Sequence, residues 1–183
     1  MTIDALAVLL CLVKPVFSHP QQWTPAECQE QAVAIHAAAS AHDLDPVAIV
    51  ATLVAECDLR TGIHRPIWTG VGKHRKQIGV DACPMGLRLY GHPFDVARWT
   101  DAALYMHAGA KMARWRKWCA AKHGGKHHWL SHYNPGNPVY SAQVLAFAAA
   151  LRGREPSGES LTARTREIVR RLLMVTKRKE QRR

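Results

Sequence analysis

In the sequence DPVAIVATLVAECDLR, residues 45–60, the almost uniformly apolar run 46–57 carries one carboxylate, Glu56, near its end. Asp45 before Pro46 is typical of a helix start, because the aspartate oxygen accepts a free backbone N–H and the proline lacks a donor where none is needed. Apolar side chains then recur at helical spacing, on a stripe of Val47, Val50, Val54 and Cys57 that Ile49 and Leu53 widen. Glu56 projects close to the side that Ile49 occupies. It is either a burial defect or an acid whose pKa is raised for function.

Helical periodicity marks several further segments, and strand signals are scarce. Helices are predicted from Thr24 to about His42, from Thr100 to Gly124–Gly125, from Pro138 to about Leu151, and from Leu161 to Val175. In the second of these, Lys111 is expected on the outer side. Residues 61–90 instead break into glycines, prolines and basic residues, which predicts a functional loop or a small hairpin. The expected fold is mainly α, with β structure limited to that hairpin.

The chain has 183 residues, of which 48% are apolar, and this is enough for one core but not for a second full domain. We predict an apolar N-terminal segment (1–23), a central domain (24–153) and a basic helical tail (154–183) as an extension outside the fold. The formal net charge is +11, and ten Lys/Arg against four Asp/Glu in residues 154–183 supply +6 of it. Such a charge indicates a polyanionic neighbour: nucleic acid, an anionic membrane or an acidic cell-wall polymer.

The first residues, MTIDALAVLLCLVKPVFSHP, contain an apolar stretch from about Ala5 to Val13 that is too short to span a bilayer as a helix. Its length is typical of a signal peptide, but Asp4 replaces the expected basic residues and no cleavage motif follows. We favour a docking or membrane-associated helix over a cleaved signal.

Five cysteines at irregular spacings, with no CxxC pair, argue against a disulfide framework and leave room for one bridge. Histidines cluster at His123, His127 and His128 without a carboxylate or thiolate beside them, so no metal site is expected. No cofactor is expected either.

Three pieces of the chain, in this order, carry a family resemblance: HDLDPVAIVATLVAECDLRTG (42–62), MGLRLYG (85–91) and HYNPGNPVYSAQVL (132–145). They are similar to a helix that ends in a Glu–Ser pair, to a Gly-Leu-Met-Gln segment and to a Tyr-Asn-x-Gly segment before a helix. These are features of the lysozyme-like lytic transglycosylases, the soluble-lytic-transglycosylase type of peptidoglycan-cleaving domain. The resemblance covers roughly residues 26–152 and implies a lysozyme-like α-helical domain.

The resemblance implies that Glu56 is the catalytic acid. In this family one carboxyl group donates a proton to the glycosidic oxygen of the MurNAc–GlcNAc β-1,4 bond. The carboxylate then takes a proton from the muramic C6 hydroxyl, and a 1,6-anhydro ring closes without water or a second carboxylate. The alternative is a hydrolytic lysozyme, which needs a second carboxylate to activate water. Asp81 is the candidate for that role.

The resemblance also implies a set of substrate-binding residues: Tyr133, Asn134, Met85, Gly86, Leu87 and Cys57. In this assignment the Tyr133 phenol holds the acid, the Asn134 amide contacts an N-acetyl group, and Gly86 lets backbone approach the sugar. The alternative for Tyr133 is a buried ring in a turn before a helix. Cys57 stands where the family has serine, and Leu89 stands where it has glutamine.

Two further features lie near these motifs. A basic stretch from Lys73 to Lys76 precedes the second piece and is unusual for that place in the family. Trp68 and Trp99 could stack on sugar rings, but packing in the core is the role we expect for each.

The leading prediction is therefore a peptidoglycan lytic transglycosylase whose partner is the glycan strand. It would act in the periplasm or cell wall, associated with a virion or membrane. The alternative is a weakly active or inactive lysozyme-like component of a phage particle or secretion apparatus, docked through the N-terminal segment and the basic tail. Nucleic acid is not the expected partner, because DNA binding would leave Glu56 and the Tyr133–Asn134 pair unexplained.

Overall fold

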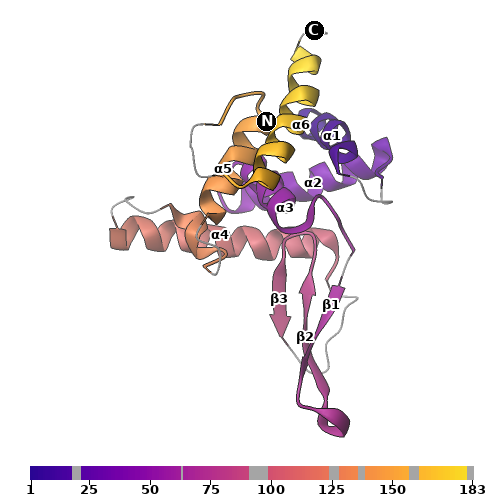
Figure 1. The fold of residues 1–183 in the computed structure, drawn as a ribbon, viewed down its shortest axis with the longest axis vertical. Helices are drawn as coiled ribbons and strands as arrows, with labels where there is room; N and C mark the ends of the chain where they lie inside the picture. The colour runs from indigo at the N-terminus through magenta and orange to yellow at the C-terminus, as the bar shows by residue number, and fades with distance from the viewer. Residues whose placement is uncertain are drawn as a thin grey trace.

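The computed structural model describes residues 1–17, 22–62, 64–90, 99–123, 128–135, 139–156 and 161–180. Helices form the body of the molecule, and a small sheet projects from it (Figure 1). In chain order, with η for 3-10 helix, the elements are α1 (Ile3–Val13), η1 (Lys14–Val16), α2 (Pro25–Ala41), α3 (Pro46–Cys57), β1 (His64–Thr69), η2 (Gly72–His74), β2 (Lys76–Ala82), β3 (Leu87–Tyr90), α4 (Asp101–His123), η4 (Trp129–His132), α5 (Tyr140–Leu151) and α6 (Ala163–Glu180). The predicted mainly α fold with a hairpin in 61–90 is confirmed. The predicted helix end at Gly124–Gly125 and helix start at Pro138 lie outside the described residues.

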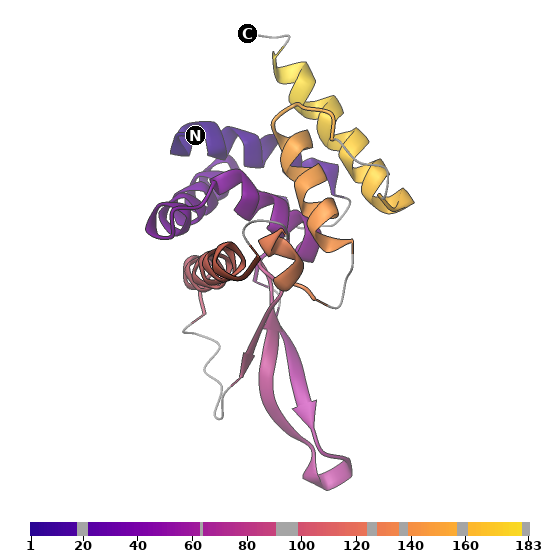
Figure 2. The same cartoon turned by 90° about the vertical axis from the view of Figure 1, so that its left-hand side faces the viewer.

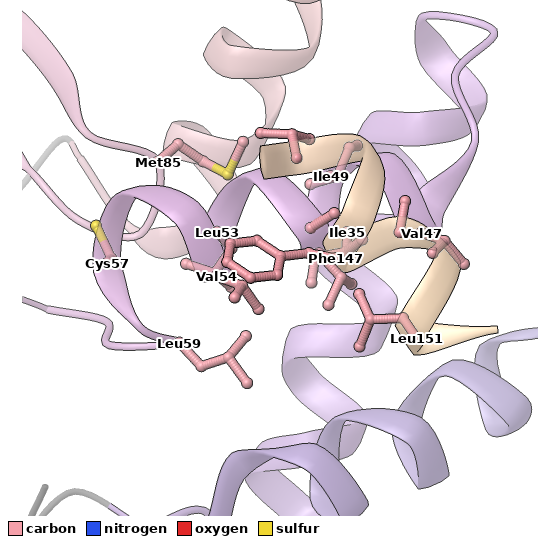
Figure 3. Close-up of a cluster of buried hydrophobic side chains, with 14 of the residues drawn as sticks. Ile35, Val47, Ile49, Leu53, Val54, Cys57, Leu59, Met85, Phe147 and Leu151 are labelled. Atoms are coloured by element: carbon pink, nitrogen blue, oxygen red, sulfur yellow. The ribbon is translucent and has the colours of Figure 1, made fainter. Parts of the chain in front are cut away.

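Helix α3 lies at the centre of the core. Asp45 begins it by accepting a hydrogen bond from the Val47 N–H at 3.0 Å, with Pro46 in the first turn. Its large apolar side chains are at most 1% exposed and lie against Phe147 and Leu151 of α5 (Figure 3). Those buried from α3 are Val47, Ile49, Val50, Leu53, Val54 and Cys57. Each large aliphatic side chain among them contributes about 1.5–3 kcal/mol on burial, so α3 is firmly anchored in the core.

Helices α2 and α4 pack against each other, and side-chain hydrogen bonds connect them within this contact. A capping box of Thr24 and Glu27 begins α2, at the helix start that was predicted at Thr24. Gln31 of α2 donates to the Asp101 carboxylate at 2.8 Å and accepts from the Tyr105 hydroxyl at 2.6 Å. Because Tyr105 is fully buried, this link satisfies a polar group that would otherwise destabilise the core.

The sheet is antiparallel, in the order β1-β2-β3. In β3, Leu87 and Leu89 are buried whereas Arg88 and Tyr90 are exposed, which is the alternation of a strand with one face on the core. Strands β1 and β2 continue past β3 as a two-stranded ribbon that leaves the body of the molecule (Figures 1 and 2).

Both terminal helices belong to the same core as the central ones, which corrects the prediction of separate extensions at 1–23 and 154–183. Helix α1 packs on α2 and helix α6 packs on α5. The side chains that α1 and α6 bury in this core are Leu6, Ala7, Leu9, Leu10, Val13, Val169, Leu172 and Leu173. The amphipathic patterns were visible in the sequence, but their partner is the domain itself. Among the described residues no single helix is long and apolar enough to cross a bilayer, although α2 and α3, bent by 118°, meet that test as a pair.

Two disulfide bonds are present where the sequence suggested at most one. Cys11 of α1 pairs with Cys28 of α2, and Cys57 at the end of α3 pairs with Cys83 in the β2–β3 turn. Cys119 is free and buried. The pairs are 17 and 26 residues apart, and helix packing rather than a spacing motif brings them together.

Removing the chain after Gly153 should unfold the domain or destabilise it strongly. The truncation deletes α6 with Val169, Leu172 and Leu173, whose burial contributes on the order of 5 kcal/mol, a large share of the stability of a typical domain. Thermal unfolding followed by circular dichroism measures the effect. Truncation after Glu180 is the matched control and should leave the melting temperature unchanged. A folded chain ending at Gly153 with a melting temperature within a few degrees of the full chain would restore the predicted boundary.

Candidate active site

Glu56 lies on the last turn of α3, half-buried, with elements from four other parts of the chain around it. The β2–β3 turn brings Gly86 against the carboxyl group. The segment after η4 contributes Asn134, the start of α5 contributes Tyr140, and α4 contributes Lys111. The structure thus collects the three resembling pieces around one acid.

Gly86 makes the closest approach to the acid. Its φ is +58°, in the region that favours glycine. A Cβ at this position would lie 2.9 Å from Glu56 Cδ and closer still to Oε2. Any side chain at 86 would therefore displace the carboxyl group or the turn, so the glycine is needed for the geometry of the site.

The Cys57–Cys83 disulfide holds this turn to α3. Cys57 follows Glu56 directly, and Cys83 comes three residues before Gly86. The covalent link therefore fixes both sides of the contact between Glu56 and the turn. This replaces the predicted role of Cys57 as a substrate-binding residue, since its sulfur is buried and bonded.

The chain after Glu56 turns sharply away from the helix axis. Asp58 and Leu59 have positive φ values of 50° and 58°, and they end α3 in a left-handed turn. The Lys14 Nζ donates to the Leu59 carbonyl, and Arg164 of α6 pairs with the Asp58 carboxylate at 2.9 Å. Contacts from both terminal elements thus hold the turn that follows the acid.

Tyr133 lies beside the site but has a different partner from the one predicted. Its hydroxyl donates to the Met85 carbonyl at 2.9 Å and does not hold Glu56. Its ring is buried, as the alternative interpretation of a buried tyrosine in a turn requires. Tyr133 therefore positions the turn that carries Gly86. Asn134 is half-buried and lowers the pKa of Glu56, so it lies near the acid.

Tyr140 was not predicted as a site residue, because its spacing from Val144, Phe147 and Leu151 is that of a stripe of core side chains on a helix. Its ring stacks on that of Tyr133, with centroids 6.1 Å apart and planes 8° from parallel. Its buried hydroxyl has no hydrogen bond of good geometry among the described residues, and the Glu56 carboxylate and Tyr133 add to the effect of burial on its pKa. Burial raises that pKa, so the phenol stays protonated as a donor directed at the acid.

Lys111 was also missed, since the sequence placed it on the outer side of its helix. The structure places it half-buried, with its ammonium 4.2 Å from the centre of the Tyr133 ring and 3.3 Å from the Tyr133 carbonyl. Burial lowers the pKa of Lys111 and the Glu56 charge opposes that shift. A signal existed in the sequence: the stripe of Leu104, Ala108, Met112 and Trp115 has Lys111 at its border, where a long side chain can reach inward.

Desolvation decides the protonation of Glu56. Burial raises the pKa of its carboxyl group, while the neighbouring Tyr140 and Asn134 side chains and the charge of Lys111 lower it. The balance leaves the pKa above its ordinary value. Glu56 therefore keeps its proton to higher pH than an exposed glutamate does. Neighbouring donors and a cation can stabilise the carboxylate once the proton has left.

The remaining predicted residues do not line an open surface. Met85 and Leu87 are 0% and 2% exposed, so their side chains belong to the core and only the Gly86 backbone of this segment is available (Figure 3 shows Met85 beside Ile49). Asp81, the candidate second carboxylate, pairs with Arg88 across the sheet at 3.1 Å.

Replacing both Cys57 and Cys83 by alanine should lower the free energy of unfolding by about 3 kcal/mol, the value expected for a loop of this length. It should also lower the pKa of Glu56 toward the ordinary range, because water reaches a carboxyl group that the turn no longer covers. Denaturant unfolding and a carbon-detected NMR titration of the glutamates measure the two effects. The control pair, Cys11→Ala with Cys28→Ala, should reduce stability and leave the Glu56 pKa unchanged. Equal pKa values in both double variants would contradict the positioning role.

Comparisons of the chain with known protein families, with curated protein sequences and with solved structures gave no match.

Proposed function

We propose that this protein cleaves peptidoglycan as a lysozyme-like lytic transglycosylase, with Glu56 as general acid and then general base. The observation that carries the proposal is a carboxyl group with a raised pKa, at the end of an apolar helix and against a glycine turn. The three resembling sequence pieces meet at this group. A protein that only binds its ligand does not need such an acid. Cleavage of a glycosidic bond requires a carboxyl group that is protonated near neutral pH.

The steps follow from the groups around Glu56. The protonated carboxyl donates its proton to the glycosidic oxygen as the bond to the muramic C1 breaks, leaving a carboxylate and an oxocarbenium-like sugar. Lys111, Asn134 and Tyr140 stabilise that carboxylate. The carboxylate then takes the C6 hydroxyl proton, and the freed oxygen bonds to C1 to form the 1,6-anhydro product.

Three observations favour this route and this setting. Asp81 is engaged by Arg88, so it is a poor candidate for the water-activating base of a hydrolytic lysozyme. Two disulfide bonds are typical of proteins in oxidising compartments, which include the periplasm and the cell exterior. The formal charge of +11 favours attraction to anionic wall polymers.

Glu56→Gln should abolish lysis of purified cell walls while the melting temperature stays within a few degrees. The amide is nearly isosteric but cannot donate an acidic proton, and loss of a general acid costs on the order of 10²-fold or more in rate. Mass spectrometry of the digested glycan measures both activity and product. Glu30→Gln, an exposed change on α2, is the control and should keep full activity. Anhydro products released by Glu56→Gln at near wild-type rate would eliminate the proposal.

Lys111→Met should move the alkaline limb of the activity profile to higher pH. Activity needs protonated Glu56 and falls as pH rises through its pKa, and Lys111 lowers that pKa, so removing the cation raises it. The maximal rate should also fall, because the carboxylate formed after proton donation loses a stabilising charge. Rates measured across pH on wild-type, Lys111→Met and the exposed control Lys117→Met decide this. A limb that moves to lower pH, or moves equally in the control, would show that Lys111 does not act on Glu56.

A further inference from the structure

The β1–β2 ribbon ends in a projecting, fully solvated tip, which we define as residues 68–76. Figures 1 and 2, which differ by a quarter turn, both place this tip at the end of the molecule opposite the C-terminus. Every residue of the tip is exposed. The tip therefore adds nothing to the core, and its composition calls for another explanation.

The charged side chains of the tip and of most of its two strands are all basic. Residues 64–80 contain Arg65, Lys73, Arg75 and Lys76 and no Asp or Glu. The nearest acidic residue, Asp81, is already paired with Arg88. The positive charge of the ribbon is therefore not neutralised locally, and its far end presents a cationic surface.

Two apolar side chains accompany these cations at the tip. Val71 is 87% exposed, the highest value among the large exposed apolar residues of the molecule as described, and Trp68 is 46% exposed. The Arg75 guanidinium lies 4.7 Å from the centre of the Trp68 ring, so one cation and the aromatic ring form a unit. This corrects the expectation that Trp68 packs in the core. A single exposed apolar residue needs no explanation by itself, but Val71 and Trp68 lie together at the end of a cationic ribbon, and this combination points to a binding surface.

We propose that the tip binds the surface of an anionic phospholipid bilayer. In this arrangement Val71 enters the boundary of the acyl chains, Trp68 lies at the level of the headgroups, and Lys73, Arg75 and Lys76 contact lipid phosphates. Lys73 lies in the turn with Val71, and Arg75 and Lys76 lie near the Trp68 ring, so cations surround an apolar side chain and an aromatic ring. This combination suits a bilayer interface, where lipid phosphates lie beside the boundary of the acyl chains. A nucleic acid or an anionic glycan would use the cations and the ring but would leave Val71 uncovered, which is why the membrane is favoured. The inference is independent of any activity at Glu56.

Neutralising the tip tests the charge component. The full chain should co-sediment with vesicles of mixed phosphatidylglycerol and phosphatidylcholine, and not with phosphatidylcholine alone. The triple variant Lys73→Gln, Arg75→Gln, Lys76→Gln should bind the mixed vesicles roughly 100-fold more weakly, at about fivefold for each cation. Melting temperatures should be unchanged, because these side chains are exposed.

A matched control separates the tip from the overall charge. Lys117→Gln, Lys122→Gln and Arg166→Gln remove the same charge from exposed positions on α4 and α6. This variant should lose less than about tenfold in vesicle affinity, through the long-range field alone. Equal weakening by the two triple variants would overturn the proposal in favour of nonspecific attraction.

Fluorescence quenching and vesicle binding test whether Val71 and Trp68 enter the bilayer. Vesicles whose acyl chains carry bromine should quench part of the tryptophan fluorescence of the wild type, and Trp68→Phe should remove that quenching while binding persists within a few-fold. Val71→Ser should weaken binding several-fold, whereas Val71→Leu should preserve it. Unchanged quenching in Trp68→Phe would overturn the insertion of this tip. Strong binding of duplex DNA or soluble glycan through the same three cations, without vesicle binding, would assign the tip to a polyanion instead.

Discussion

Withdrawal of one carboxyl group from water is the constraint on which the site depends. Glu56 belongs to a helix whose other positions are almost all buried, so the same packing that stabilises α3 also desolvates its acid. The side chains of Tyr140 and Asn134 and the cation Lys111 oppose the rise of its pKa. A fully apolar setting would hold the proton too tightly to give it up, and a solvated setting would lose it too early.

Much of the helical framework could be predicted from local signals. Asp45–Pro46 and Thr24 with Glu27 mark helix starts by the chemistry of the first turn, which needs no knowledge of the rest of the fold. Glu56 was identifiable because a carboxylate on an apolar helix is a conflict within one element. These inferences use interactions within a few residues along the chain, where sequence and structure correspond most directly.

The parts that could not be predicted depend on which elements meet. Lys111 contacts Tyr133 only because α4 packs against the end of η4 and the residues that follow it. Tyr140 has the helical spacing of a core residue. This spacing cannot distinguish a tyrosine in the core from one beside the acid. The apolar stripe of α6 was visible, but nothing local shows whether its partner is the same chain. Long-range packing decides each of these cases, and a single sequence does not encode it in a short pattern.

The order of the cysteines along the chain bears on how the molecule acquires its bonds. Cys11 pairs with Cys28 and Cys57 with Cys83, so each pair consists of consecutive cysteines, and the unpaired Cys119 comes last. In a chain that enters an oxidising compartment with its N-terminus first, the first cysteine of each pair has as its partner the next cysteine to arrive. Both bonds can therefore close before the competing thiol appears. Pairing by order of arrival would let the turn beside Glu56 be fastened before α4 and α5 complete the site around it.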